Sequence, residues 1–333
     1  MTVGLVSVIM PVHNAATTVG TAIDAVLRQT WKALELIVYD DASEDETRDR
    51  VLQRAEDDER IRLIAGPRRG IVGALQEGCR HARGTLLARM DGDDDLHPTR
   101  LERQLAALEA DPDAALCGTG VAMFGERVGR GRRRYEHWLN RLTHHDAIRR
   151  ELFVECPLAH PSFTMRRNAF EAVGGYEDHG WAEDYDLCMR MACGGYRFAT
   201  VAAPLLRWRE SAGRLSMNSD RYSPARFRAL KRHYLFDLHP LEGRDFYQWG
   251  VGQVGKPWLR EWDTPRPLAA VDIHPRKIGR TIHQTPVIAP EELPPPGTAF
   301  TVVAVGAPGA RTEIRAWMNP RGYVEGRDYL FIA

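Results

Sequence analysis

The first hundred residues alternate between two hydrophobic periods, and this alternation limits the chain to few folds. Apolar runs of strand length occupy residues 5–12, 34–39, 61–65 and 85–90. Between them, apolar residues recur at helical spacing, as in the segment from Val19 to Leu27. Near-continuous apolar strands separated by amphipathic helices are typical of a parallel sheet that helices cover on both faces. The sequence therefore predicts an α/β fold built on a mainly parallel sheet.

Polar residues follow each of the four predicted strands. They are residues 11–14, Asp40 with Asp41, residues 68–70 and residues 91–95. In an open parallel sheet, ligands bind outside the carboxyl ends of the strands. We therefore expect these four segments, distant in sequence, to meet at one edge of the sheet and to form a ligand site.

The segment MDGDDD, residues 90–95, brings Asp91, Asp93 and Asp94 close together in sequence. Carboxylates at one strand end repel one another unless a cation neutralises them. Oxygen ligands suit Mg²⁺ or Mn²⁺, which also bind phosphate oxygens. A solvated acidic turn would have the same local sequence, so the segment alone leaves both interpretations open.

Composition excludes several classes of protein. The 333 residues carry 45 basic and 45 acidic side chains, which argues against a nucleic-acid partner bound by a basic body. Five cysteines without a CxxC pair indicate neither a disulfide framework nor a zinc ribbon, and they favour a reducing cytoplasm. The N-terminus lacks a signal-peptide pattern, and no apolar run reaches the ~18 residues that span a bilayer. We therefore expect a cytoplasmic protein, at most peripheral to the inner face of a membrane.

Composition changes near residue 242. Ten of the 20 prolines lie between residues 257 and 308. The α/β pattern starts again there, with predicted strands at residues 245–249, 268–271 and 298–305 and a helix at 311–318. We predict a first domain of residues 1–221, a linking helix at 222–242 and a small Rossmann-like domain of residues 243–333.

The segment GVGQVGK, residues 250–256, follows a predicted strand and opens a helix. Gly250, Gly252 and Gly255, with Asp272 at the end of the next strand, have the context of a dinucleotide fingerprint. Residues 271–293 also resemble the nucleotide-sugar-binding domain of bacterial sugar acyltransferases. Three interpretations stay open for the tail: a structural or partner-docking module, a second nucleotide site, or a redox cofactor site.

Six segments of the first two thirds of the chain, taken in order, resemble the motifs of family 2 glycosyltransferases. They are SVIMPVHNA (7–15), VYDDAS (38–43), RRGIVGALQEG (68–78), ARMDGDDD (88–95), HPSFTMRRNAFEAVGGY (160–176) and AEDYDLCMRM (182–191). The resemblance implies a GT-A fold and a nucleotide-sugar donor, with UDP as the expected nucleotide. It also implies inverting, metal-dependent transfer to a hydroxyl of a cell-surface glycan or a lipid-linked acceptor.

The same resemblance assigns the donor site. Asp41 would accept a hydrogen bond from a uracil-like imide N–H and Asp40 would support it, with helix capping as the alternative role. Asp91 and Asp93 match the DxD pair, one contacting ribose and the other Mn²⁺ or Mg²⁺, and Asp94 would be a further ligand or acceptor. The remaining nucleotide-binding positions are Pro11, Val12, His13, Asn14, Arg68, Arg69, Gly70 and Gly92.

Glu183 and Asp184 match the ED motif of the family, which makes Asp184 the expected general base. Displacement with inversion needs such a carboxylate to take the proton of the acceptor hydroxyl. An acid at a helix N-terminus, favoured by the helix dipole, is the alternative role for Asp184. His160 and Trp181 would lie near the acceptor, with a structural histidine and a core tryptophan as alternatives.

Two features depart from the family or stand outside it. In LLRWRESAGRLS, residues 205–216, Ser211 stands where the family has a histidine that often completes the metal site, and Glu210 or water could replace it. Five arginines in residues 127–134 predict a loop, either solvated or binding a phosphorylated or lipid-linked acceptor at an anionic membrane face. The alternative functions are an NAD(P)-dependent oxidoreductase led by the tail and a non-catalytic sugar-nucleotide sensor.

Overall fold

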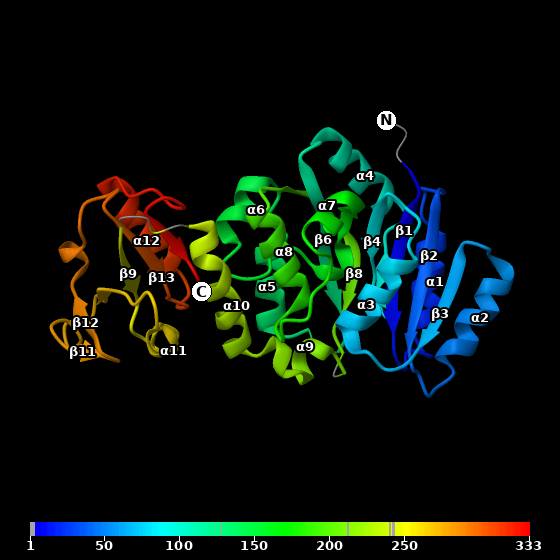
Figure 1. The fold of residues 1–333 in the computed structure, drawn as a ribbon, viewed down its shortest axis with the longest axis horizontal. Coiled ribbons are helices and arrows are strands. Elements are labelled where there is room, and N and C mark those ends of the chain that lie inside the picture. Colours follow the sequence, from blue (N-terminus) through cyan, green and yellow to red (C-terminus); the bar gives the residue numbers. More distant parts are fainter. Residues whose placement is uncertain (1–3, 127, 212, 240, 242–243) are drawn as a thin grey trace. The chain divides into compact units, whose positions relative to one another are not determined.

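The computed structural model describes residues 4–126, 128–211, 213–239, 241 and 244–333 (Figure 1). The chain forms two compact units. The first comprises Met1–Ile148 and Cys156–Arg226, and the second comprises Arg149–Glu155 and Phe227–Ala333. The domain boundaries expected at residues 221 and 242 stay predictions, and residues 240, 242 and 243 of that region lie outside the described residues.

The first unit contains an eight-stranded sheet with the order β3-β2-β1-β4-β7-β6-β8-β5. The four strands at one side of this order are parallel, as the alternating pattern predicts, whereas β7 is antiparallel to both of its neighbours and β5 is antiparallel to β8. The strands are β1 (Val6–Val12), β2 (Leu34–Asp41), β3 (Ile61–Gly66), β4 (Leu86–Arg89), β5 (Asp95–Leu96), β6 (Ala114–Phe124), β7 (Thr164–Arg166) and β8 (Arg197–Arg209). The predicted mainly parallel α/β architecture is confirmed.

Helices cover both faces of this sheet because successive residues of a strand point to opposite sides. Val8 of β1 shares one core with Ile23 of α1 (Val19–Leu27) and Leu105 of α4 (Arg100–Ala110). On the opposite face, α3 (Gly70–His81) approaches β1 so closely that a Cβ on Gly78 would lie 2.5 Å from Ile9 Cγ2. Helix α2 (Thr47–Asp57) packs beside α1.

The arginine-rich segment is a helix, so the predicted loop is wrong. Helix α5 (Arg130–Leu139) begins inside the run, and Arg127 lies outside the described residues. Arginine has a high helix propensity, and Tyr135, Trp138 and Leu139 supply an apolar side that packs on the core. The described residues between α5 and Asn218 also form α6 (His145–Glu151), α7 (Arg167–Ala172), α8 (Glu183–Cys193) and α9 (Leu215–Asn218).

The strand order reverses between β1 and β4. The chain passes from β1 to β2 and β3 on one side and then returns to β4 on the other side. In open α/β sheets, ligands bind at such a reversal, outside the carboxyl ends of the strands. The four polar segments that follow β1 to β4 therefore lie at the edge where a ligand site is expected.

The second unit contains a six-stranded sheet with the order β11-β12-β10-β9-β13-β14. Its strands are β9 (Asp245–Trp249), β10 (Ala269–Val271), β11 (Thr281–Ile282), β12 (Thr285–Ile288), β13 (Ala299–Val303) and β14 (Tyr329–Phe331). Its helices include α11 (Gly255–Glu261), α12 (Ala310–Met318) and, from Phe227 on, α10 (Pro224–Leu238). All neighbouring pairs are parallel except β11 with β12. No helix of the described residues is both long enough and apolar enough to cross a bilayer.

Candidate functional site

Hydrogen bonds join the loops after β1 and β2. Asn14, with a left-handed φ of 50°, donates its main-chain N–H to Ser43 Oγ at 2.9 Å and accepts at Oδ1 from the N–H of Glu44 at 2.9 Å. His13 Nδ1 lies 3.0 Å from the main-chain oxygen of Asp41. These contacts hold the end of β1, where Pro11 and Val12 were expected to cradle a nucleotide, against the end of β2.

Asp41 connects the end of β2 to the start of α3. Its Oδ1 accepts from the N–H of Arg69 at 2.6 Å, and its Oδ2 accepts from the N–H of Gly70 at 3.0 Å. Arg68 Nε lies 3.5 Å from Oδ2. The helix-capping role is therefore present, and the expected base-binding residues do gather here. Each carboxylate oxygen has a second lone pair with which a base N–H can still be bound.

Asp40 is fully buried beneath this loop. It accepts from the N–H of Ser43 at 3.1 Å and forms an ion pair with Arg48 at 3.1 Å. Its carboxylate is thus committed to the loop after β2, which fits a supporting role for Asp41.

Three carboxylates of the loop after β4 come together. Asp91, Asp93 and Asp94 each place one oxygen within 4.8 Å of the others. Gly92 lets this loop approach β1, because a Cβ there would lie 2.7 Å from Val12 Cγ1. The DxD segment therefore lies beside the end of β1, at the reversal of the strand order.

Burial makes it unfavourable for all three carboxylates of this cluster to be ionised at once. Burial would raise the pKa of Asp91, but an ion pair with Arg89 at 2.6 Å outweighs it and the pKa is lowered. Burial, together with the charge of Asp91, raises the pKa of Asp93 to about 6 and that of Asp94 well above its usual range. The charges of Arg89, Arg209 and Arg214 oppose this rise in the pKa of Asp93 but do not cancel it.

The cluster fits a divalent cation. Asp94 Oδ1 accepts from the N–H of Arg209 at 2.7 Å, whereas its buried Oδ2 has no hydrogen-bond partner among the described residues. Buried polar atoms are usually paired, so an unpaired carboxylate oxygen beside two more carboxylates indicates a missing positive ligand. Mg²⁺ and Mn²⁺ take such oxygen donors.

Glu210 does not belong to this group. The carboxylates that come together in the described part of the chain are those of Asp91, Asp93 and Asp94, while Glu210 pairs with Arg132 at 2.5 Å and with Arg214. Glu210 is thus engaged with two arginines, and its expected role as a metal ligand in place of a histidine at position 211 stays a prediction. Arg214 instead contributes charge, because it lowers the pKa values of Asp91 and Asp93 against the effect of burial.

The ED motif lies at the start of α8. Glu183 is buried, accepts from Tyr222 Oη at 2.9 Å and lies 3.5 Å from His160 Nδ1. His160 Nε2 lies 2.8 Å from Tyr176 Oη, so the structural role expected as an alternative for this histidine is present. Burial lowers the pKa of His160, while Glu183 and Asp91 oppose that effect, which links the ED motif electrostatically to the DxD loop.

Asp184 is half-buried and follows Glu183 in the first turn of α8. Its Oδ1 accepts from the N–H of Tyr185 at 2.8 Å, and its charge acts on Tyr176 and Tyr222. Trp181 donates its indole N–H to Asp186 Oδ1 at 2.7 Å. Asp184 is thus a half-buried carboxylate next to Glu183 in the first turn of α8.

Sequence reasoning missed the residues that hold these motifs. Arg209 and Tyr222 contact the DxD and ED motifs from segments more than 35 positions away in the chain. Arg89 was detectable, because it immediately precedes the acidic segment and is buried beside it. Arg209 lies in the segment 205–216 that the sequence singled out, but nothing there showed its contact with Asp94, and Tyr222 had no distinguishing local pattern.

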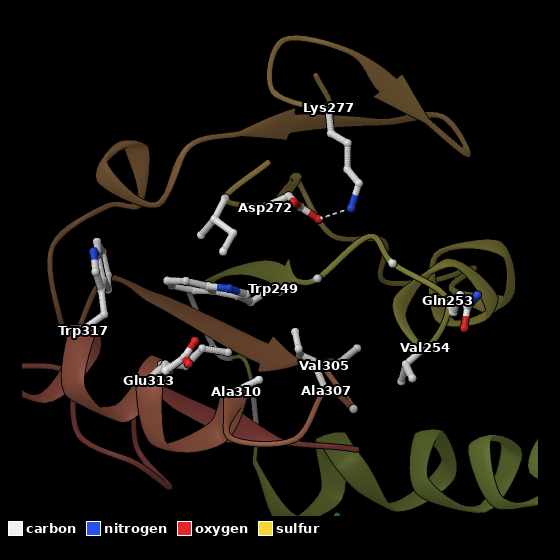
Figure 2. A pocket seen from close by; sticks show the side chains of 16 residues that line it. Trp249, Gln253, Val254, Asp272, Lys277, Val305, Ala307, Ala310, Glu313 and Trp317 are labelled. Carbon is white, nitrogen blue, oxygen red and sulfur yellow. Dashed lines mark hydrogen bonds and ion pairs between the residues drawn. The ribbon is translucent and has the colours of Figure 1, made fainter. Parts of the chain in front are cut away.

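The glycine-rich segment of the second unit forms part of the wall of a pocket. Gly250 has a φ of 107°, and a Cβ on Gly255 would lie 1.9 Å from the main-chain oxygen of Gly250. Asp272 accepts from the N–H of Val251 at 3.2 Å and pairs with Lys277 at 2.9 Å. Gly250, Gly252 and Asp272 line the pocket in Figure 2.

Comparison with known proteins identifies the family. The model of Glycosyl transferase family 2 matches residues 7–174. The EpsE protein of Bacillus subtilis strain 168 is 33% identical over 223 residues, which cover 66% of this chain and 77% of EpsE. The chain belongs to glycosyltransferase family 2, and it is a glycosyltransferase.

Two further matches are more distant or shorter. The UDP-Glc:alpha-D-GlcNAc-diphosphoundecaprenol beta-1,3-glucosyltransferase WfgD of Escherichia coli is 39% identical over 105 residues, which cover 31% of this chain and 41% of WfgD. The crystal structure of S. aureus TarS 1-349 in complex with UDP-GlcNAc matches with a TM-score of 0.56 at 15% identity, covering 71% of this chain and 66% of that chain. The TarS match, together with the family, confirms the predicted GT-A-like fold.

Proposed function

We propose that this glycosyltransferase moves a sugar with inversion from a UDP-sugar donor to a hydroxyl of a cell-surface glycan or lipid-linked acceptor, and that it depends on a divalent metal. The observation that carries the proposal is the DxD cluster, with three carboxylates within 4.8 Å and a buried Asp94 Oδ2 that has no partner among the described residues. Asp91, Asp93 and Asp94 would hold Mn²⁺ or Mg²⁺, which would supply positive charge for the diphosphate leaving group.

Asp184 is the proposed general base. Inverting transfer needs a carboxylate on the side opposite the leaving group, within reach of the acceptor hydroxyl. Glu183 is a positioning residue: its contacts with His160 and Tyr222 fix the first turn of α8, and Asp184 is the next residue of that turn. His160 and Trp181 would border the acceptor from the same region.

Donor and acceptor classes are supported by the name of WfgD, which states a UDP-Glc donor and a diphosphoundecaprenol-linked acceptor. Arg130, Arg133 and Arg134 of α5 are exposed and would attract the phosphates of such an acceptor at an anionic membrane face. We also propose that residues 1–221 form the transferase domain, which residues 222–242 link to an accessory domain of residues 243–333.

The test replaces Asp184 by Asn and measures sugar transfer and donor binding separately. We expect transfer or donor hydrolysis to fall by about 10²–10⁴-fold, because general base catalysis contributes that much. Binding of a UDP-sugar with Mn²⁺ should change little, because the substitution keeps the size of the side chain. Asp113→Asn, an exposed substitution between α4 and β6, is the matched control and should keep full activity.

Each alternative has its own outcome in the same assays. Retained turnover in Asp184→Asn would remove this residue from the role of base. A wild-type protein that binds UDP-sugars but neither transfers nor hydrolyses them would be a sensor. A preference for NAD(H) over every UDP-sugar would favour the oxidoreductase.

A further inference from the structure

The second unit contains a pocket of about 610 Å³ whose lining includes none of the residues proposed for sugar transfer (Figure 2). Residues at the carboxyl ends of β9, β10 and β13 line it. The strand order reverses there, because β10 lies on one side of β9 and β13 on the other. Such a reversal is the usual ligand site of an open α/β sheet, and the volume is that of a small-molecule site.

One side of the pocket is aromatic. Trp249 at the end of β9 and Trp317 of α12 lie with their ring centroids 5.2 Å apart, and Ile314 adds to this wall. Glu313 is a lining residue at this side and offers carboxylate oxygens that accept hydrogen bonds. An apolar wall with flat rings and one acceptor suits a nucleobase, which presents a planar face and N–H donors.

The opposite side is formed by the main chain of two loops. Residues 252–254 precede α11 and residues 305–307 precede α12. None of these six residues donates its main-chain N–H to another residue of the described part of the chain. Concave groups of free main-chain N–H donors bind anions such as phosphate. In Figure 2, Gln253 and Val254 lie on the side away from Trp317, with Trp249 between them.

The open space at Gly252 also indicates that a ligand approaches this loop. A Cβ on Gly252 would meet no atom within 4 Å, and its φ is not left-handed. Gly255 differs, because its Cβ would collide with the main chain of Gly250. Packing and backbone strain thus require a glycine at 255 but not at 252, whereas a ligand approaching the loop would require the space at Gly252.

Lys277 adds a positive charge at the rim. Its ammonium lies 2.9 Å from Asp272 Oδ2, and Asp272 also accepts from the N–H groups of Val251 and His274. Asp272 therefore holds the glycine-rich loop and Lys277 in place. The ammonium keeps two further N–H donors that a phosphate can use.

We propose that this pocket binds a nucleoside phosphate, with the base against Trp249 and Trp317 and the phosphate at the two loops and Lys277. The site is separate from the donor site of the first unit, because every lining residue belongs to the second unit. The proposal does not rest on the chemistry assigned to the DxD and ED motifs, so its failure would leave that function untouched.

The experiment measures binding of UDP, ADP and NAD⁺ to the full chain by isothermal titration calorimetry in EDTA. Ala310→Phe places a ring in the pocket, and Ala316→Phe places the same ring on the exposed side of the same helix as a matched control. We expect at least one probe to bind wild type and Ala316→Phe equally and Ala310→Phe at least about tenfold more weakly. The probe that binds most tightly identifies the preferred base.

Lys277→Gln provides a second variant, which also serves if Ala310→Phe does not fold. This substitution should weaken binding of the phosphorylated probe about tenfold, because charge-assisted hydrogen bonds to the phosphate are lost. Binding of the corresponding nucleoside, which has no phosphate, should not change. The proposal is overturned if no probe binds, or if neither Ala310→Phe nor Lys277→Gln weakens binding. Measuring sugar transfer by Ala310→Phe shows separately whether the first unit is still active.

Discussion

Replacing Asp93 by Asn should stabilise the metal-free protein, and the gain should grow as the pH rises. In the folded protein the pKa of Asp93 is raised to about 6 by burial and by the charge of Asp91, against an ordinary value of 3.8. An acid whose pKa is raised by folding destabilises the folded state wherever it is ionised. Asparagine has nearly the same shape but no charge, so it removes this penalty.

The pKa shift sets the size of the effect. One unit corresponds to about 1.4 kcal/mol, so a rise from 3.8 to about 6 costs about 3 kcal/mol of folding free energy above pH 7. At pH 4 Asp93 is protonated in the folded state and the penalty is below about 1 kcal/mol. The difference between variant and wild type should therefore appear between pH 4 and pH 7 and then stay constant.

Urea unfolding in EDTA, followed by circular dichroism at pH 4, 6 and 8, measures this difference. Adding Mn²⁺ should stabilise wild type and not Asp93→Asn, because the ion neutralises the carboxylates that otherwise repel one another. Asp95→Asn is the control: Asp95 lies two residues on but outside the cluster, paired with Arg207 at 3.0 Å, and the variant should keep the Mn²⁺ effect. A pH-independent gain, or equal stabilisation of both proteins by Mn²⁺, would refute the reasoning.

Two further pairs of substitutions test the main-chain contacts at the start of α3 and in the glycine-rich loop before α11. Asp41→Ala should cost about 2 kcal/mol in the free energy of unfolding, because two N–H groups at the start of α3 lose their acceptor; Asp41→Asn, which keeps one acceptor, should cost less. Gly255→Ala should lower the stability of the second unit by about 1–3 kcal/mol in thermal denaturation, because the added Cβ would lie 1.9 Å from the main-chain oxygen of Gly250. Gly252→Ala is the control: its Cβ would meet open space, so the substitution should cost under about 1 kcal/mol.

The strands of the first unit were predictable where they are long and buried. The apolar run at residues 34–39 becomes β2 (Leu34–Asp41), every residue of which is buried, because a parallel strand covered on both faces must be apolar throughout. The short strands β7 (TMR) and β12 (TPVI) were not predicted, because polar residues or a proline leave neither of them an apolar run. Helix α5 was missed because its arginines suggested a loop, although Tyr135, Trp138 and Leu139 recur at helical spacing.

The candidate site, like the fold, has a part that the sequence could predict and a part that it could not. The carboxylates of the DxD segment are neighbours in sequence, so their proximity could be predicted without a fold. The partners that decide their charge come from distant segments: Arg209 caps Asp94 from the end of β8, and Arg214 lies beyond it. Glu210 illustrates the limit of the sequence, because its partner Arg132 lies 78 positions away in α5 and no feature of either segment pairs them.

Both units place a candidate phosphate site at a reversal of strand order, but they surround it with opposite chemistry. In the first unit the loop after β4 presents carboxylates, so a diphosphate can approach only with a cation between them. In the second unit the loops after β9 and β13 present free N–H groups beside Lys277, which can bind phosphate directly. Metal dependence therefore separates the two sites in one protein: EDTA should abolish UDP binding in the first unit and leave nucleoside phosphate binding in the second unit intact.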